Sequence, residues 1–134
     1  MNDVDAAYIA GLFDGEGSVY YKLTKRKRHD RPGKPVHNTW VIRMEIAMTD
    51  QSILIWLWET LGCGKVKPRK VKPGKKPQWR WRCSHRDAYN VCKVIWPFVH
   101  VKLEKINQII AHYSVEKLDN VVYLNNYKDK KYEV

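Results

Sequence analysis

The sequence has no run of about 18 apolar residues, the length that a membrane-spanning helix needs. Cysteine is scarce, and Cys63, Cys83 and Cys92 form no close pair, so neither a disulfide framework nor a zinc site is expected. The first 18 residues lack the positive charge of a signal peptide and carry Asp3 and Asp5 instead. These absences predict an intracellular protein, in a prokaryotic or phage-infected cytoplasm or an organelle. A length of 134 residues is enough for one domain with a hydrophobic core but not for two.

Acidic residues are also scarce in the middle of the chain. Residues 19–86 carry 18 Lys or Arg against four Asp or Glu, whereas residues 87–134 carry seven against six. Residues 1–18 carry four acids and no Lys or Arg. A net charge of +11 placed so unevenly indicates a nucleic-acid surface built from the middle of the chain. The alternative is a basic surface that is merely solvated.

Small residues and two acids stand together near the start of the chain. Ala7, Gly11 and Gly15 recur every four residues, so on a helix they share one face, where a second helix can approach closely. Asp14 and Glu16 stand at the expected end of that helix. Because a glycine inside a helix is unfavourable by roughly 0.5–1 kcal/mol relative to alanine, the combination indicates a site rather than ordinary packing.

Two other structures fit parts of this segment. An ordinary helix with a glycine C-cap and exposed acids stays open as an alternative. A calcium-binding loop would use Asp14, Glu16 and Ser18 as ligands, but it needs glycine and glutamate where the chain has Val19 and Lys25. The calcium loop is therefore excluded.

Hydrophobic periodicity and turn residues divide the chain into helices and strands. We expect a helix, two strands, a second helix, two more strands and two final helices. Asp3 is the expected N-cap of the first helix, and Gly62 and Gly64 end the second. The expected ranges are 3–14, 17–28, 37–48, 53–61, 65–71, 78–83, 86–95 and 103–118, with 119–134 as a tail outside the domain formed by residues 1–118.

Each expected strand alternates apolar and polar side chains, so it has one apolar and one polar face. In 37–48, for example, Ile42, Met44 and Ile46 alternate with Arg43 and Glu45. Four tryptophans are expected in the core: Trp40, Trp56, Trp58 and Trp96. The side chains expected to bind nucleic acid from the polar face are Tyr20, Lys22, Thr24, Arg26, Arg28, Thr39, Arg43, Lys65, Lys67, Arg69, Gln78, Arg80 and Arg82.

The dimensions of this face favour double-stranded DNA as the partner. A strand of about ten residues spans roughly 33 Å, on the order of ten base pairs. A strand ribbon fits the major groove of DNA, where donors and acceptors distinguish all four base pairs, whereas an RNA helix hides its major groove. The Arg side chains suit guanine edges, and the Lys side chains suit bases or phosphates alike.

Residues 9–17, IAGLFDGEG, resemble the signature of the LAGLIDADG homing endonucleases. Five of the nine positions are unchanged: Ala10, Gly11, Leu12, Asp14 and Gly17. The other four, which replace the leucine, isoleucine, second alanine and second aspartate of the signature, are Ile9, Phe13, Gly15 and Glu16. The resemblance covers about residues 5–115. It implies an α+β fold with an αββαββα core, in which helices pack on one face of a four-stranded antiparallel, saddle-like sheet.

The resemblance also implies an activity, the site-specific double-strand cleavage of a long, near-palindromic DNA target by metal-dependent phosphodiester hydrolysis. Glu16 matches the catalytic acid and, with the backbone carbonyl of Gly15, would bind Mg²⁺ or Mn²⁺, with two or more ions per dimer. Lys102 maps to a position that offsets transition-state charge or orients water. Asp50 maps to a water-organising position, although the N-cap of helix 53–61 is an equal alternative. One turn after the position of Asp50 the family often has a basic residue, whereas this chain has Leu54.

Because the signature occurs once, the resemblance implies a homodimer. Its first helices would pair through Ala7, Gly11 and Asp14 and bring two Glu16 carboxylates together. The alternatives are an RNA maturase of the same fold, which would bind intron RNA, and a DNA-binding regulator that never cleaves. The presence of Glu16 and Lys102 favours the enzyme, which in this family serves intron or intein mobility.

Overall fold

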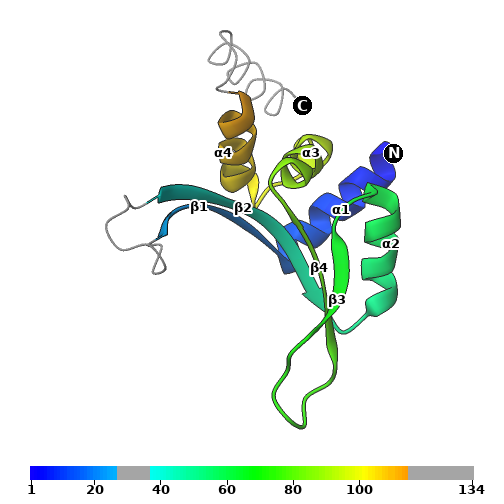
Figure 1. The fold of residues 1–134 in the computed structure, drawn as a ribbon. Coiled ribbons are helices and arrows are strands. Elements are labelled where there is room, and N and C mark those ends of the chain that lie inside the picture. The colour runs from blue at the N-terminus through cyan, green and yellow to red at the C-terminus, as the bar shows by residue number, and fades with distance from the viewer. Residues whose placement is uncertain (27–36, 115–134) are drawn as a thin grey trace.

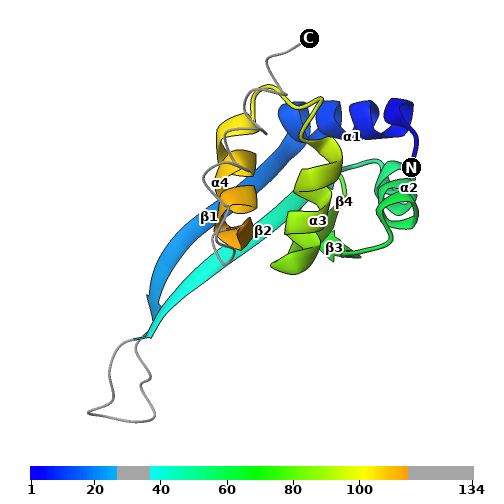
Figure 2. The same cartoon turned by 90° about the horizontal axis from the view of Figure 1, so that it is seen from above.

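The computed structural model describes residues 1–26 and 37–114, which form four helices and a four-stranded sheet. In chain order the elements are α1 (Asp3–Glu16), β1 (Gly17–Arg26), β2 (His37–Met48), α2 (Gln51–Leu61), β3 (Lys65–Arg69), β4 (Gln78–Ser84), α3 (Arg86–Ile95) and α4 (Leu103–Ser114). The strands are antiparallel, in the spatial order β1-β2-β4-β3. The helices cover one face of this curved sheet and leave the other face open (Figure 1, Figure 2). The predicted α+β fold is therefore confirmed.

The element boundaries follow the prediction for β2 and α3 and differ by one or two residues for α1, α2, β3 and β4. The predicted N-cap of α1 was wrong: Asn2 caps this helix, because its side-chain oxygen accepts a hydrogen bond of 2.8 Å from the Asp5 backbone N–H. The same helix continues to Glu16, two residues beyond the predicted end. In the hairpin, β3 ends at Arg69 and β4 reaches Ser84.

Several predicted features lie outside the described residues. They are the end of the first strand and its loop, within 27–36, the last residues of the fourth helix, 115–118, and the tail, 119–134. None of the helices within 1–26 and 37–114 is long and apolar enough to cross a membrane.

The core lies between the sheet and its helices, and Trp81 of β4 is fully buried within it. The Trp81 ring meets Phe13 of α1 edge-on at 5.8 Å between ring centroids. Its indole N–H donates a 3.0 Å hydrogen bond to the Cys63 carbonyl, so the polar atom of this ring is satisfied. Trp81 thus joins α1, β4 and the turn after α2.

The expectation of four core tryptophans holds for Trp96, which is 3% exposed, and Trp56 packs against the core while partly buried. It is wrong for Trp40 and Trp58, which are 38% and 47% exposed. The apolar stripe of α2 is centred on the fully buried Leu54 and Leu57, so the next residue, Trp58, faces outward. Trp40 lies near the start of β2, where its ring stacks on that of Tyr21 of β1 with 4.5 Å between the ring centroids.

Two glycines with the same positive backbone angle allow a direct test of the packing around Trp81. Gly64 and Gly74 both have φ of +86°, which strains any other residue. A Cβ at Gly64 would stand 2.5 Å from the indole nitrogen of Trp81, whereas a Cβ at Gly74 would meet open space. We expect Gly74→Ala to lose only the backbone term, on the order of 1 kcal/mol. Gly64→Ala should lose a further 1–3 kcal/mol, roughly, through overpacking.

Urea unfolding of the two variants, followed by circular dichroism, measures the difference. Because the backbone strain is common to both, equal losses of unfolding free energy would contradict the assigned role of Trp81.

Candidate functional site

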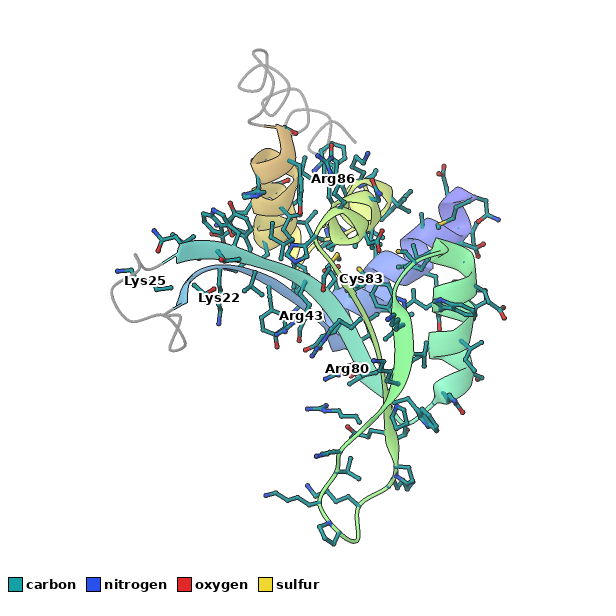
Figure 3. All side chains as sticks on the ribbon, in the orientation of Figure 1. Lys22, Lys25, Arg43, Arg80, Cys83 and Arg86 are labelled. Atoms are coloured by element: carbon teal, nitrogen blue, oxygen red, sulfur yellow. The ribbon has the colours of Figure 1, made fainter. Side chains whose placement is uncertain are left out.

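The open face of the sheet carries basic side chains from several strands. The register places Lys65 directly opposite Arg82, and Lys67 directly opposite Arg80. Like charges that face each other across strands are destabilising, and an anionic partner bound to this face would relieve that repulsion. Figure 3 shows Arg43 and Arg80 projecting on the side of the sheet away from α3 and α4.

The structure describes the side chains of all predicted contact residues except Arg26 and Arg28. Arg28 lies outside the described residues, and only the backbone of Arg26 is described. The others occupy alternate positions of the paired strands and share the open face: Tyr20, Lys22, Thr24, Thr39, Arg43, Lys65, Lys67, Arg69, Gln78, Arg80 and Arg82. The predicted division of the strands into two faces is confirmed, and contact with DNA stays a prediction.

Several of these side chains are held by neighbours on the same face. The Arg43 guanidinium lies over the Tyr20 ring, 4.4 Å from its centroid. Arg69 donates a 3.3 Å hydrogen bond to the Gln78 side-chain oxygen on the facing strand. Such contacts reduce the conformational freedom that these side chains would lose on binding a partner.

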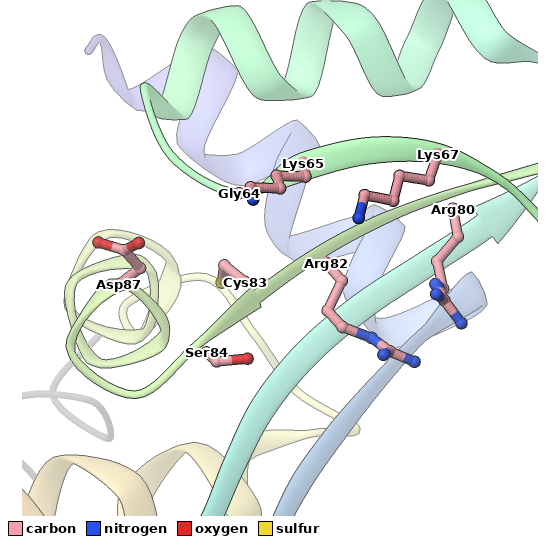
Figure 4. Close-up of a pocket in the computed structure, with 8 residues that line it drawn as sticks. All are labelled: Gly64, Lys65, Lys67, Arg80, Arg82, Cys83, Ser84 and Asp87. Atoms are coloured by element: carbon pink, nitrogen blue, oxygen red, sulfur yellow. The ribbon is translucent and has the colours of Figure 1, made fainter.

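A pocket of about 340 Å³ opens beside the edge strand β3 (Figure 4). Four cationic side chains line it: Lys65, Lys67, Arg80 and Arg82. Ser84, at the end of β4, and Asp87, near the start of α3, complete its polar lining. The excess of positive charge suits a phosphate group.

Glu45 of β2 is the functional candidate that the sequence-based set of contact residues missed. Its Oε2 atom accepts hydrogen bonds from Nε of Arg82 at 2.9 Å and from Nη2 of the same guanidinium at 2.7 Å. Arg80 Nε stands 3.9 Å from that oxygen. Partial burial alone would raise the pKa of Glu45, but the Arg82 hydrogen bond and charge, with Arg43 and Tyr20, hold the pKa below its usual range. The carboxylate is therefore charged at neutral pH.

The C-terminal end of α1 presents a second candidate centre. The helix ends at Glu16 and β1 begins at Gly17, so no loop separates the exposed Glu16 from the strand that follows. Gly17 is required here, because a Cβ would stand 2.7 Å from Cα of Phe13 and 2.9 Å from its carbonyl oxygen. A bulkier residue would push the strand away from the helix.

The donors at this end of α1 fit a hard metal ion. The Glu16 carboxylate and the Gly15 carbonyl, one of the last carbonyls of the helix, are oxygen donors of the kind that Mg²⁺ and Mn²⁺ prefer. Within residues 1–26 and 37–114, no three His, Cys, Asp or Glu residues form a cluster that could hold a metal ion. Further donors would therefore have to come from DNA, water or a second copy of the chain.

Asp14 ties the turn before α4 to the end of α1. Its carboxylate oxygens accept hydrogen bonds from the backbone N–H groups of His100 at 2.8 Å and Lys102 at 3.0 Å. The predicted pair of Glu16 and Lys102 is thereby held on neighbouring segments that are 86 residues apart in the chain. This contact gives Asp14 a role within one chain, and its predicted place in a dimer interface stays a prediction.

Asp50 caps the N-terminus of α2. One carboxylate oxygen accepts from the Ser52 hydroxyl at 2.6 Å, the Ser52 backbone N–H at 3.0 Å and the Ile53 N–H at 3.3 Å. The Ser52 hydroxyl, followed by the Ile53 N–H, lowers the pKa of Asp50. The alternative predicted for Asp50, a role as the N-cap of α2, is therefore confirmed. Its predicted role in organising water stays a prediction.

The face of α1 that carries the small residues is exposed. Ala7, Gly11 and Gly15 face solvent, and a Cβ at either glycine would meet no atom of the described chain within 4 Å. Val4 and Tyr8 on the same helix are 78% and 49% exposed. An apolar helix face with so little bulk can accept a second helix at close range.

No family model and no curated protein matches the chain. Its fold is similar to that of solved homing endonucleases. The homing endonuclease I-CvuI in complex with an I-CreI target has a TM-score of 0.63 and 17% identity, over 96% of this chain and 80% of that one. The archaeal intron-encoded homing endonuclease I-Vdi141I complexed with DNA has a TM-score of 0.61 and 16% identity, over 98% and 87%. I-SmaMI bound to its uncleaved DNA target has a TM-score of 0.60 and 14% identity, over 96% of this chain but 45% of that one.

At these identities the likeness establishes the class of fold, that of the homing endonucleases.

The contact between Asp14 and the turn before α4 can be tested by removing one or both of the carboxylate oxygens that accept its hydrogen bonds. Asp14→Asn keeps one oxygen for the two N–H groups, whereas Asp14→Ala keeps none. We expect Asp14→Ala to lower the free energy of unfolding by roughly 1–3 kcal/mol, because two N–H donors lose a charged partner. Asp14→Asn should lose less. Chemical unfolding at a fixed protein concentration measures both, and an Asn variant as stable as the wild type would contradict the role of both oxygens.

Proposed function

We propose that the chain is a homodimeric, site-specific DNA endonuclease of the homing type, formed by residues 1–118 and dependent on Mg²⁺ or Mn²⁺. The observation that carries the proposal is the direct junction of α1 and β1. The exposed Glu16 carboxylate immediately precedes a strand whose polar side chains line the open basic face. A duplex bound on that face would pass its backbone beside Glu16, so recognition and hydrolysis would share one strand.

The sheet would bind the major groove of the duplex. Its curvature and the exposed Lys and Arg side chains support this orientation, since a groove admits a strand ribbon and its phosphates favour cations (Figure 3). Lys65 and Lys67, which line the pocket beside β3, would hold backbone phosphates. Arg43, Arg80 and Arg82 would contact base edges, where the guanidinium fork matches guanine.

The hydrolytic chemistry would belong to the end of α1. A bound divalent cation supplies charge stabilisation for the attacking hydroxide and the leaving alkoxide. Glu16 and the Gly15 carbonyl would hold that cation. Lys102, kept next to α1 by the hydrogen bond that its backbone N–H donates to Asp14, would add positive charge where the pentavalent phosphate develops negative charge. Asp50 would orient water in addition to capping α2.

Dimerisation would join two copies through the exposed face of α1. The open space at Gly11 and Gly15 and the exposed Val4 support this interface. The coverage of I-SmaMI also supports it, because nearly all of this chain matches less than half of that one. A two-fold axis along α1 would bring one Glu16 to each DNA strand and would require a palindromic or nearly palindromic target.

Removal of the Glu16 charge should separate cutting from binding. We expect Glu16→Gln to reduce the cleavage rate by more than about 100-fold, the scale of losing a group that stabilises transition-state charge, and to leave DNA affinity within a few-fold. The wild-type protein is first incubated with a library of long randomised duplexes and Mg²⁺, and sequencing of the cut ends gives its target. The variant is then tested on that target.

Two comparisons make this experiment decisive. Glu59→Gln, an equal charge change at an exposed position of α2, should cut like the wild type, and a chelator should stop all cutting. Binding of the duplex without cutting by the wild type would favour the non-catalytic regulator. Binding of structured intron RNA with no cut DNA would favour the maturase.

The dimer can be tested by filling the space on α1. Gly11→Leu should leave the single chain folded, because its side chain enters open space, but it should separate the paired helices. We expect sedimentation to show a dimer for the wild type and a monomer for this variant. Asn90→Leu, which places the same leucine side chain at an exposed position of α3, should stay dimeric. A wild-type monomer at micromolar concentration would contradict the proposed assembly.

A further inference from the structure

Among the strand residues that the structure describes, within 17–26 and 37–84, Glu45 is the only acidic one. It lies on β2, an inner strand, and its register partners are Ser18 on β1 and Arg82 on β4. Arg43 stands two positions before it on the same face. A negative charge at this place opposes the DNA affinity of the surface around it, so its presence needs a physical explanation.

The contacts of Glu45 fix the guanidinium of Arg82 in a defined orientation. Nε and Nη2 of Arg82 both donate to one carboxylate oxygen, which leaves Nη1 and the second hydrogen of Nη2 unused by this pair. That remaining end of the guanidinium has the two parallel N–H groups that match O6 and N7 of guanine. The Glu45 side chain is 16% exposed and that of Arg82 is 34% exposed, so the pair is held near the sheet while the end of Arg82 stays accessible.

Simple neutralisation of charge explains this arrangement less well. The facing pairs Lys65–Arg82 and Lys67–Arg80 are both like-charged. An acid placed at equal distance from the two pairs would reduce the repulsion within both. Glu45 instead makes short contacts with Arg82 and a longer one, 3.9 Å, with Arg80. The acid is directed at one guanidinium.

We propose that Glu45 is a specificity-determining residue of the DNA interface: it holds Arg82 in position to read a guanine, and its charge weakens binding to DNA that lacks that base. The inference rests on the proposed DNA-binding function and goes beyond it by naming the residue that sets one base preference. A carboxylate accepts but cannot donate, so it also disfavours guanine O6 and phosphate oxygens at its own position. The C·G pair contacted by Arg82 would therefore be read in one orientation.

The test is a binding selection with randomised duplex DNA, in which Ca²⁺ replaces Mg²⁺ so that cutting does not affect the outcome. We expect the wild type to prefer guanine at one position in each half-site. Glu45→Gln keeps the shape of the side chain but frees Arg82, and it should reduce that preference roughly tenfold, the scale of one bidentate contact. The affinity of Glu45→Gln for random-sequence duplex should rise several-fold, with a steeper dependence on salt as Arg82 turns to phosphate.

Three variants distinguish this role from a general charge effect. Glu59→Gln makes the same charge change on α2 and should alter neither base preference nor random-sequence affinity. Arg82→Lys keeps the positive charge but loses the fork, so it should lose the guanine preference without a gain in random-sequence affinity. The double variant Glu45→Gln/Arg82→Lys should lose no further preference, because both changes remove the same contact.

The outcomes separate the inference from the function on which it rests. If the wild type binds no duplex DNA, the proposed function itself fails. If the wild type selects a target and Glu45→Gln, folded by circular dichroism, selects the same target with the same preferences, the inference is wrong and Glu45 only neutralises charge. A variant that loses the guanine preference while its random-sequence affinity rises supports the inference.

Discussion

The arrangement of this protein depends on one constraint, the burial of a single face of the sheet. Ile42, Met44 and Ile46 of β2 and Trp81 of β4 have almost no exposed surface, and all four helices close over them. Because strand residues alternate, this burial forces the residues between them onto the opposite face. The basic surface is thus a geometric consequence of the core, and a shift of register by one residue would destroy both together.

The junction between α1 and β1 links this surface to the candidate active site. A helix that runs directly into a strand leaves no flexible loop between the Glu16 carboxylate and the polar side chains of β1. The close approach at Gly17 keeps the two elements tightly joined, and Asp14 adds the turn before α4 to the same place. Two successive elements and a turn that is distant in sequence therefore meet beside the proposed catalytic carboxylate.

Much of the fold could be predicted from the sequence because its signals are local. The strand alternation, the stop signals at Gly62 and Gly64 and the small residues of α1 each depend on neighbours in the chain. The errors arose where tertiary contacts decide. Trp58 lies one position after the buried Leu57 of α2, and Trp40 lies near the start of β2, where the core does not cover it fully. Asp14 accepts hydrogen bonds from residues 100 and 102, and Glu45 pairs with Arg82. Both contacts join segments that are distant in sequence, so no local pattern indicates them. For Glu45, the isolation of one acid among basic strands was the available signal.

The joint at Asp14 uses backbone N–H groups rather than side chains of the facing segment. Every residue except proline carries such a donor, so the position of the turn is independent of the identity of the side chains at 100 and 102. These two contacts can therefore persist when the side chains at 100 and 102 are changed to any residue other than proline. Loss of the catalytic role proposed for Lys102 and loss of structure would therefore be separate events at this place in the molecule.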